Sequence, residues 1–142
     1  MTYLLDTDTL SIWQHGKGPD FATLLLRLSA HAPDEIGVAI VTMHEQVKGA
    51  NAYLSQGRTV ADLVEGYRRL EDLRVWFTRL NVVPFDAAVG TVFEQLKAAK
   101  IRVGTMDLRI AATALSRGLT VVTRNDRDFA QVPGLKVEDW TR

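Results

Sequence analysis

Short apolar runs alternate with longer amphipathic segments along this chain. Four of the runs are rich in β-branched side chains and bounded by polar or turn residues, which is typical of strands buried on both faces of a sheet. A fifth run is short enough for an edge strand. The five runs are TYLL (2–5), IGVAIV (36–41), NVVPF (81–85), LTVVT (119–123) and LKVED (135–139).

Segments between these runs carry apolar residues three and four positions apart, as amphipathic helices do. This spacing predicts helices over 60–80, 86–101 and 107–118, and Gly118 is a candidate C-cap of the last one. Strands that alternate with helices form parallel sheets covered by those helices. The sequence therefore predicts an α/β fold, with a mainly parallel central sheet flanked by helices on both faces.

Composition narrows the possible functions. At 142 residues, 46% of them hydrophobic, the chain is expected to form a single domain over 1–142. Its 17 basic and 17 acidic residues balance, so any nucleic-acid surface must be local. The absence of cysteine excludes disulfides, thiolate metal sites and a thiol nucleophile, and it is consistent with a cytoplasmic location. No leader peptide or membrane-spanning segment is expected.

Acidic and amide side chains lie at or just after the predicted strand ends. Ligands of parallel sheets bind outside the carboxyl ends of the strands, so we expect these side chains to meet at one edge. Their mutual repulsion would be costly unless a cation bound between them. Asp6 and Asp8 follow the first strand, the second strand is expected to run on through Thr42 to Glu45, Asp107 opens the helix before the fourth strand, and Asn125, Asp126 and Asp128 follow that strand.

Most of these acids also have a purely structural interpretation. Asp6 is a candidate N-cap, and Thr42 with Glu45 forms the pattern of a capping box. Asp107 suits the positive end of a helix dipole, and Asp128 suits a turn. The chain has no serine-nucleophile motif and no Gly-rich phosphate loop, and its three histidines have no motif context, so none is assigned to the site.

The segment LLDTDTL (4–10) resembles the opening of haloacid-dehalogenase-type phosphohydrolases, which is D-x-D-x-T after an apolar strand. In that class the first Asp is a phosphorylated nucleophile, so the resemblance implies this role for Asp6. The match fails further along the chain. The segment GTMDLRI (104–110) lacks the second acid pair, typically G-D-x-x-x-D, and no lysine follows a fitting strand.

A second resemblance covers nearly the whole chain. Four stretches resemble the PIN-domain ribonucleases, and within them the VapC toxins of type II toxin–antitoxin systems: YLLDTDTLS (3–11), VTMHEQVKGA (41–50), VGTMDLRIAATALSRGLTVVTRNDRDF (103–129) and VPGLKVEDW (132–140). Members carry an Asp after the first strand, a Glu in T-x-x-E-x-x-x-G, an Asp opening D-x-x-I-A-A-x-A, and a final T-x-N/D loop. These motifs fall on Asp6, on Glu45 with Gly49, on Asp107 and on the loop from Thr123, while Asp8 stands where many members have asparagine.

The resemblance implies a PIN-like domain with metal-dependent endoribonuclease activity. Asp6, Glu45, Asp107 and a side chain of the final loop would hold Mg²⁺ or Mn²⁺, and a water activated by the metal would attack the phosphodiester without a protein nucleophile. The resemblance also implies single-stranded or looped RNA as substrate, a homodimer and a VapB-type antitoxin partner. A catalytically silent PIN module that binds RNA is an alternative, because it would keep the same fold.

The fourth member of this site has three candidates in TRNDRDF (123–129). The family position falls on Asn125, but a hard cation prefers a carboxylate. In an extended loop, residues two apart point the same way, so Asp126 and Asp128 are expected to face the site together. The predicted order is Asp126, then Asp128, then Asn125, and Thr123 and Asp8 are further candidates.

Overall fold

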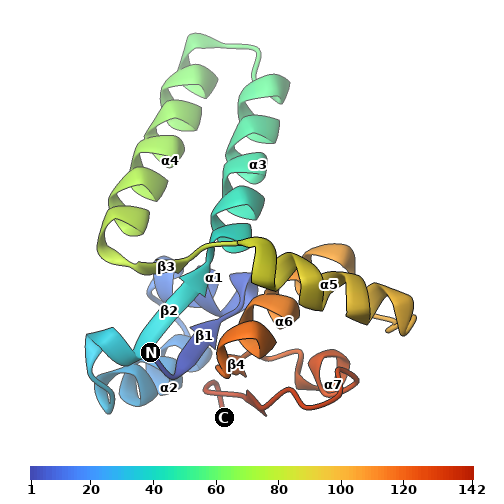
Figure 1. The fold of residues 1–142 in the computed structure, drawn as a ribbon. Coiled ribbons are helices and arrows are strands. Elements are labelled where there is room, and N and C mark those ends of the chain that lie inside the picture. Colours follow the sequence, from blue (N-terminus) through green and yellow to red (C-terminus); the bar gives the residue numbers. More distant parts are fainter.

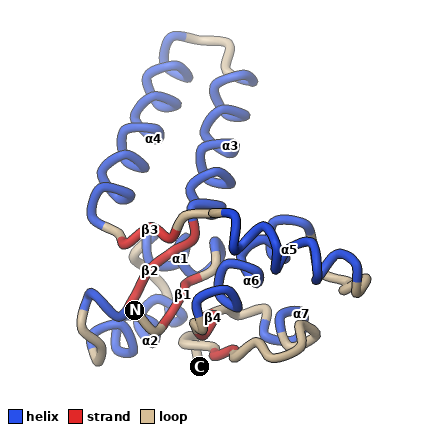
Figure 2. Tube along the Cα trace, viewed as in Figure 1, coloured by secondary structure: helices blue, strands red, loops and turns tan.

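A central sheet of five parallel strands organises the molecule. The computed structural model describes all residues from 1 to 142, and the strands lie in the order β3-β2-β1-β4-β5 (Figure 2). The predicted parallel sheet and its edge strand are therefore confirmed. The strands are β1 (Tyr3–Leu5), β2 (Ile36–Ala39), β3 (Asn81–Val83), β4 (Thr120–Val122) and β5 (Val137–Glu138).

Seven α-helices and one short 3₁₀-helix connect the strands. The three helices predicted from apolar spacing are present as α4, α5 and α6. The predicted C-cap Gly118 ends α6 in the left-handed conformation, with φ of 65°. Gly16 ends α1 in the same way, with φ of 67°. The helices are α1 (Thr7–His15), α2 (Pro19–Ser29), α3 (Ile40–Gln56), α4 (Val60–Arg79), α5 (Ala87–Ala98), α6 (Thr105–Arg117) and α7 (Asp126–Phe129), and the 3₁₀-helix is Pro33–Glu35.

Both faces of the sheet are covered, as predicted. Successive residues of a strand point to opposite faces, and the neighbours Leu4 and Leu5 accordingly belong to two different apolar clusters. The cluster around Leu4 contains side chains of α5, α6 and α7, whereas the cluster around Leu5 contains side chains of α1 and α2. The sheet is thus held from both sides, and its carboxyl-terminal edge is fixed in place.

The second strand is shorter than predicted. It ends at Ala39, and α3 begins at Ile40, so Thr42 and Glu45 lie inside a helix rather than in a strand. The predicted capping box is wrong for the same reason, because the N-cap residue of α3 is Ala39. A buried apolar run has the same pattern at the end of a strand and at the start of a buried helix, so the sequence could not locate this boundary.

The helices α3 and α4 form a hairpin that projects away from the sheet (Figure 1). Gly66 allows the two helices to approach closely, since a Cβ atom at this position would collide with the side chain of Leu54. The base of α3 lies beside the sheet and carries Glu45. No helix of the chain combines the length and apolar composition required to cross a membrane.

Candidate active site

Asp6 lies where β1 ends and α1 begins, and it is 4% exposed. Its Oδ1 accepts a hydrogen bond from the backbone N–H of Thr9 at 2.8 Å, so the predicted N-cap role is confirmed. Burial raises the pKa of the Asp6 carboxyl, while hydrogen bonds from Thr123 and Thr9 act in the opposite direction. A cap at the surface would do the same capping without this desolvation cost, so burial indicates a second role for Asp6.

Glu45 approaches Asp107 from the first turns of α3. The hydroxyl of Thr7 donates to Glu45 Oε1 at 2.6 Å and lies 3.1 Å from the hydroxyl of Thr42, which is fully buried. This contact ties the start of α1 to α3 and orients the glutamate. Thr7 was not among the predicted site residues, because a threonine at the start of a helix has no sequence signal for a contact 38 positions away.

Asp107 shows that acids from separate parts of the chain converge. Its pKa is raised to about 6, first by burial and then by the negative charges of other carboxylates. Those carboxylates belong to Asp6, Glu45, Asp128 and Asp8. Four of the predicted acids therefore lie close enough to Asp107 for their charges to act on its carboxyl group.

The final loop differs from its prediction. Residues 126–129 form the short helix α7 and are not extended. Because successive helical residues turn by about 100°, two residues that are two apart point in nearly opposite directions, so Asp126 and Asp128 do not face the site together. Asp128 is the one whose charge raises the pKa of Asp107, and it also accepts a hydrogen bond from the side-chain amide of Asn125 at 3.0 Å.

The carboxylate of Asp8 is paired with the guanidinium of Arg124. Arg124 donates to both of its carboxylate oxygens, from Nε at 2.8 Å and from Nη2 at 3.1 Å. Thr123, which precedes Arg124, is fully buried. Its hydroxyl forms a hydrogen bond with the side chain of Asp6 and accepts one from the backbone N–H of Asn125 at 2.8 Å. Thr123 therefore supports the site, and Asp8 is paired.

The donor set suits a hard divalent cation. The facing groups of Asp6, Glu45, Asp107 and Asp128 are all carboxylates, and no cysteine exists in the chain. As the side chains stand, no three histidine, aspartate or glutamate residues enclose a common metal position. A divalent cation among these carboxylates would remove the repulsion that raises the pKa of Asp107, and oxygen ligands match the preference of Mg²⁺ and similar ions.

Asp107→Asn is expected to stabilise the metal-free protein at neutral pH. The folded protein binds the Asp107 proton more tightly than the unfolded chain, because its pKa is about 6 against the ordinary 3.8. Stability is therefore lost as pH rises from about 4 to about 6, and asparagine removes this loss. Since the group is only half-buried, solvent screening limits the gain to about 1 kcal/mol. Thermal unfolding with a chelator, measured across this range, should show a gain that shrinks as pH falls.

Asp86, the N-cap of α5, provides the matched control. The backbone N–H of Val89 holds the pKa of the Asp86 carboxyl below its usual range, with Arg117 adding to the effect. The same substitution at Asp86 should therefore lower stability at neutral pH. An equal shift in both variants would contradict the repulsion described for Asp107.

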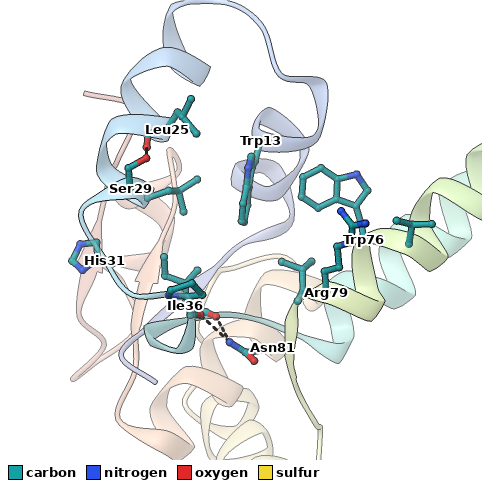
Figure 3. A pocket seen from close by; sticks show the side chains of 12 residues that line it. Trp13, Leu25, Ser29, His31, Ile36, Trp76, Arg79 and Asn81 are labelled. Carbon is teal, nitrogen blue, oxygen red and sulfur yellow. Dashed lines mark hydrogen bonds between the residues drawn. The ribbon is translucent and has the colours of Figure 1, made fainter.

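A large pocket with a mostly apolar lining lies elsewhere. It measures about 660 Å³ and is bordered by Trp13 and Trp76, whose ring centroids are 5.3 Å apart (Figure 3). Its floor includes Ile36 and Asn81, which begin β2 and β3. The pocket thus lies at the amino ends of these strands, whereas the acids gather at the carboxyl ends, so the two sites are separate.

Comparisons with known proteins agree with this architecture. The PIN domain family model matches residues 3–135. The tRNA(fMet)-specific endonuclease VapC of Shigella flexneri is 36% identical over 108 residues, covering 73% of this chain and 74% of the relative. The protein of the same name from Salmonella typhimurium is 31% identical over 144 residues, covering 99% and 98%. The DNA-bound VapBC structure from Salmonella typhimurium superposes with a TM-score of 0.79 at 28% identity, covering 99% of this chain and 98% of that one.

Proposed function

The chain belongs to the PIN domain family and, within it, to the VapC ribonucleases, and from this membership we propose that it hydrolyses RNA phosphodiester bonds at the cluster of Asp6, Glu45 and Asp107. The observation that carries the proposal is the raised pKa of Asp107, because its causes include, after burial, carboxylates from three other parts of the chain. The phosphohydrolase alternative is not favoured. It gives no role to Glu45 or to the final loop, both of which approach Asp107.

Nucleases of this family are generally dependent on a divalent metal ion, and for this chain we propose Mg²⁺ or Mn²⁺. Asp6, Glu45, Asp107 and an acid of the final loop would hold it, since all of these donors are oxygen. When bound, such an ion would lower the pKa of a bound water and neutralise the charge that develops on the phosphate.

The contacts of the chain support this assignment of roles. Asp6 is oriented by hydrogen bonds from Thr9 and Thr123, and Glu45 is oriented by Thr7. Two of the carboxylates are therefore held in place before any ligand binds, which reduces the cost of ordering them later. The pKa of Asp107 is raised first by burial and then by the negative charges of nearby carboxylates. Those charges favour a cation over a bare RNA phosphate, so RNA is expected to bind productively only with the metal present.

The partners follow from the relatives. The Salmonella typhimurium structure is a VapBC complex, and this chain resembles its solved component over nearly the full length. We therefore propose a VapB-type antitoxin as the protein partner, a homodimer as the assembly, a single PIN domain over residues 1–142 and a cytoplasmic site of action. The substrate named for the relatives, tRNA(fMet), is the first RNA to test.

The decisive experiment is RNA cleavage by the purified chain with controlled metal. We expect no cleavage in EDTA and recovery when excess Mg²⁺ or Mn²⁺ is added, because the carboxylates alone offer no nucleophile activated at neutral pH. Binding of RNA in both conditions without cleavage in either would instead support the catalytically silent module. Turnover of p-nitrophenyl phosphate without RNA cleavage would restore the phosphohydrolase alternative.

A further inference from the structure

Arg124 joins three separate elements beside the acidic cluster. It lies two residues after the end of β4, and its guanidinium donates to both carboxylate oxygens of Asp8 at 2.8 and 3.1 Å. Its remaining nitrogen, Nη1, donates to Asp20 Oδ2 at 2.8 Å. Asp8 belongs to the first turn of α1 and Asp20 to the first turn of α2. Arg124 therefore fastens the loop after β4 to the starts of two helices.

Stability does not explain this arrangement well. The side chains of Arg124, Asp8 and Asp20 are 44%, 50% and 45% exposed. Ion pairs that are this accessible to water contribute little to folding, because solvent screens them and the side chains lose freedom. A planar, two-bond grip nevertheless fixes the direction of a carboxylate, which a single contact does not. The main effect of Arg124 is therefore to fix the orientation of the Asp8 carboxylate.

Asp8 is placed where its orientation matters. It lies two residues after Asp6, and its charge is among those that raise the pKa of Asp107. A free carboxylate this close would compete with Asp6 and Asp107 for a divalent cation, since carboxylate oxygens are interchangeable as ligands of hard ions. Both oxygens of Asp8 are occupied by Arg124, so the competition is suppressed.

The loop after Arg124 carries the other acid of interest. Asn125 follows it directly, and Asn125 in turn donates to Asp128 at 3.0 Å. Thr123, on the other side of Arg124, is buried against Asp6. Fixing Arg124 between α1 and α2 therefore also fixes the position from which Asp128 approaches Asp107.

We propose that Arg124 is a positioning residue that reserves the metal ion for Asp6, Glu45 and Asp107 by occupying both oxygens of Asp8, while it holds the loop of Asp128 against α1 and α2. The proposal rests on the proposed function, because it presumes metal-dependent cleavage of RNA. It differs from a direct role in which the guanidinium binds an RNA phosphate. It also differs from a purely structural role, in which the ion pair only stabilises the fold.

These three roles predict different combinations of metal affinity and rate for Arg124→Gln. Releasing the charge of Asp8 should make Mn²⁺ bind about threefold to tenfold more tightly, because a unit charge nearby attracts the ion through a partly screened medium. The rate constant for cleavage at saturating Mn²⁺ should nevertheless fall about tenfold, because the ion shifts toward Asp8. Loss of a purely structural contact would weaken binding and slow cleavage together. Loss of a phosphate contact would raise KM and leave Mn²⁺ affinity unchanged.

The test is a double-mutant cycle with Asp8→Asn, in which Mn²⁺ binding is measured by electron paramagnetic resonance without RNA. Asparagine keeps the shape of Asp8 but removes its charge, so adding Arg124→Gln to Asp8→Asn should change Mn²⁺ affinity and rate by less than about threefold. Arg127→Gln is the matched control, since Arg127 lies three residues after Arg124, in α7, and is exposed. Its Mn²⁺ affinity and rate should equal those of the wild type.

The outcomes separate the proposal from its premise. If the wild type does not cleave RNA with Mn²⁺, the proposed function fails. If the wild type cleaves, two results would overturn the positioning role. One is that Arg124→Gln lowers the cleavage rate equally whether residue 8 is aspartate or asparagine. The other is that Arg124→Gln leaves the Mn²⁺ affinity unchanged. Melting temperatures of all variants should stay close to the wild type, and a large drop confined to Arg124→Gln would indicate the structural role instead.

Discussion

Asp6→Asn and Asp107→Asn are each expected to lower the rate of RNA cleavage by at least about a thousandfold, because a misplaced or missing metal ion forfeits several kcal/mol of transition-state stabilisation. Asparagine preserves the size of the side chain, and at Asp6 it also preserves the N-cap bond to Thr9. The folded state should therefore survive in both variants. Circular dichroism and thermal unfolding, measured beside the cleavage rate, would verify this.

Asp86→Asn is the appropriate control for this prediction. Asp86 caps α5 by accepting from the backbone N–H of Val89 at 3.1 Å, just as Asp6 caps α1 by accepting from Thr9 at 2.8 Å. The two aspartates thus share a local role, but only Asp6 contacts the acidic cluster. Cleavage should persist in Asp86→Asn. If cleavage also persisted in the Asp6 and Asp107 variants, these acids would be caps and nothing more.

The sheet and the main helices could be predicted because their signals are local. An apolar run of β-branched residues and a three-to-four spacing each reflect the element in which they occur. The boundary between β2 and α3 could not be located in this way, since IGVAIV is apolar throughout and passes from strand to helix without a polar residue. Glu45 consequently occupies a helix, although its place at the sheet edge was predicted correctly.

The approach of Asp6, Glu45 and Asp128 to Asp107 could be predicted because a parallel sheet brings the carboxyl ends of its strands to one edge. The residues that orient them could not. Thr7 reaches Glu45 across 38 positions, and Arg124 reaches Asp8 across 116. Threonine and arginine occur at many surface positions, so neither has a sequence pattern that marks such a contact. The hydroxyl of Thr7 and the guanidinium of Arg124 could therefore be identified as partners of the acids only from the structure.

The geometry of the final loop reverses part of the predicted order. The argument for Asp126 assumed an extended loop, and the loop is helical from Asp126 onward. Asp126 begins α7, and its side chain makes no hydrogen bond or ion pair, whereas Asp128 acts on Asp107 and is oriented by Asn125. Asp128 is therefore the stronger candidate for the fourth member of the site, although the family position falls on Asn125.

Asp128→Ala is accordingly expected to raise the Mn²⁺ concentration needed for half-maximal cleavage by at least about tenfold, because a hard cation loses a charged ligand or a close neighbour. Asp126→Ala should change it by less than about twofold, as expected for a charge that does not act on Asp107. Asn125→Ala should lie between them, because it frees Asp128 to rotate without removing its charge. A titration of cleavage rate against Mn²⁺ for the three variants decides the order. A larger rise at Asp126 than at Asp128 would support the order predicted from the sequence, and a rise confined to Asn125 would assign the fourth position to an amide.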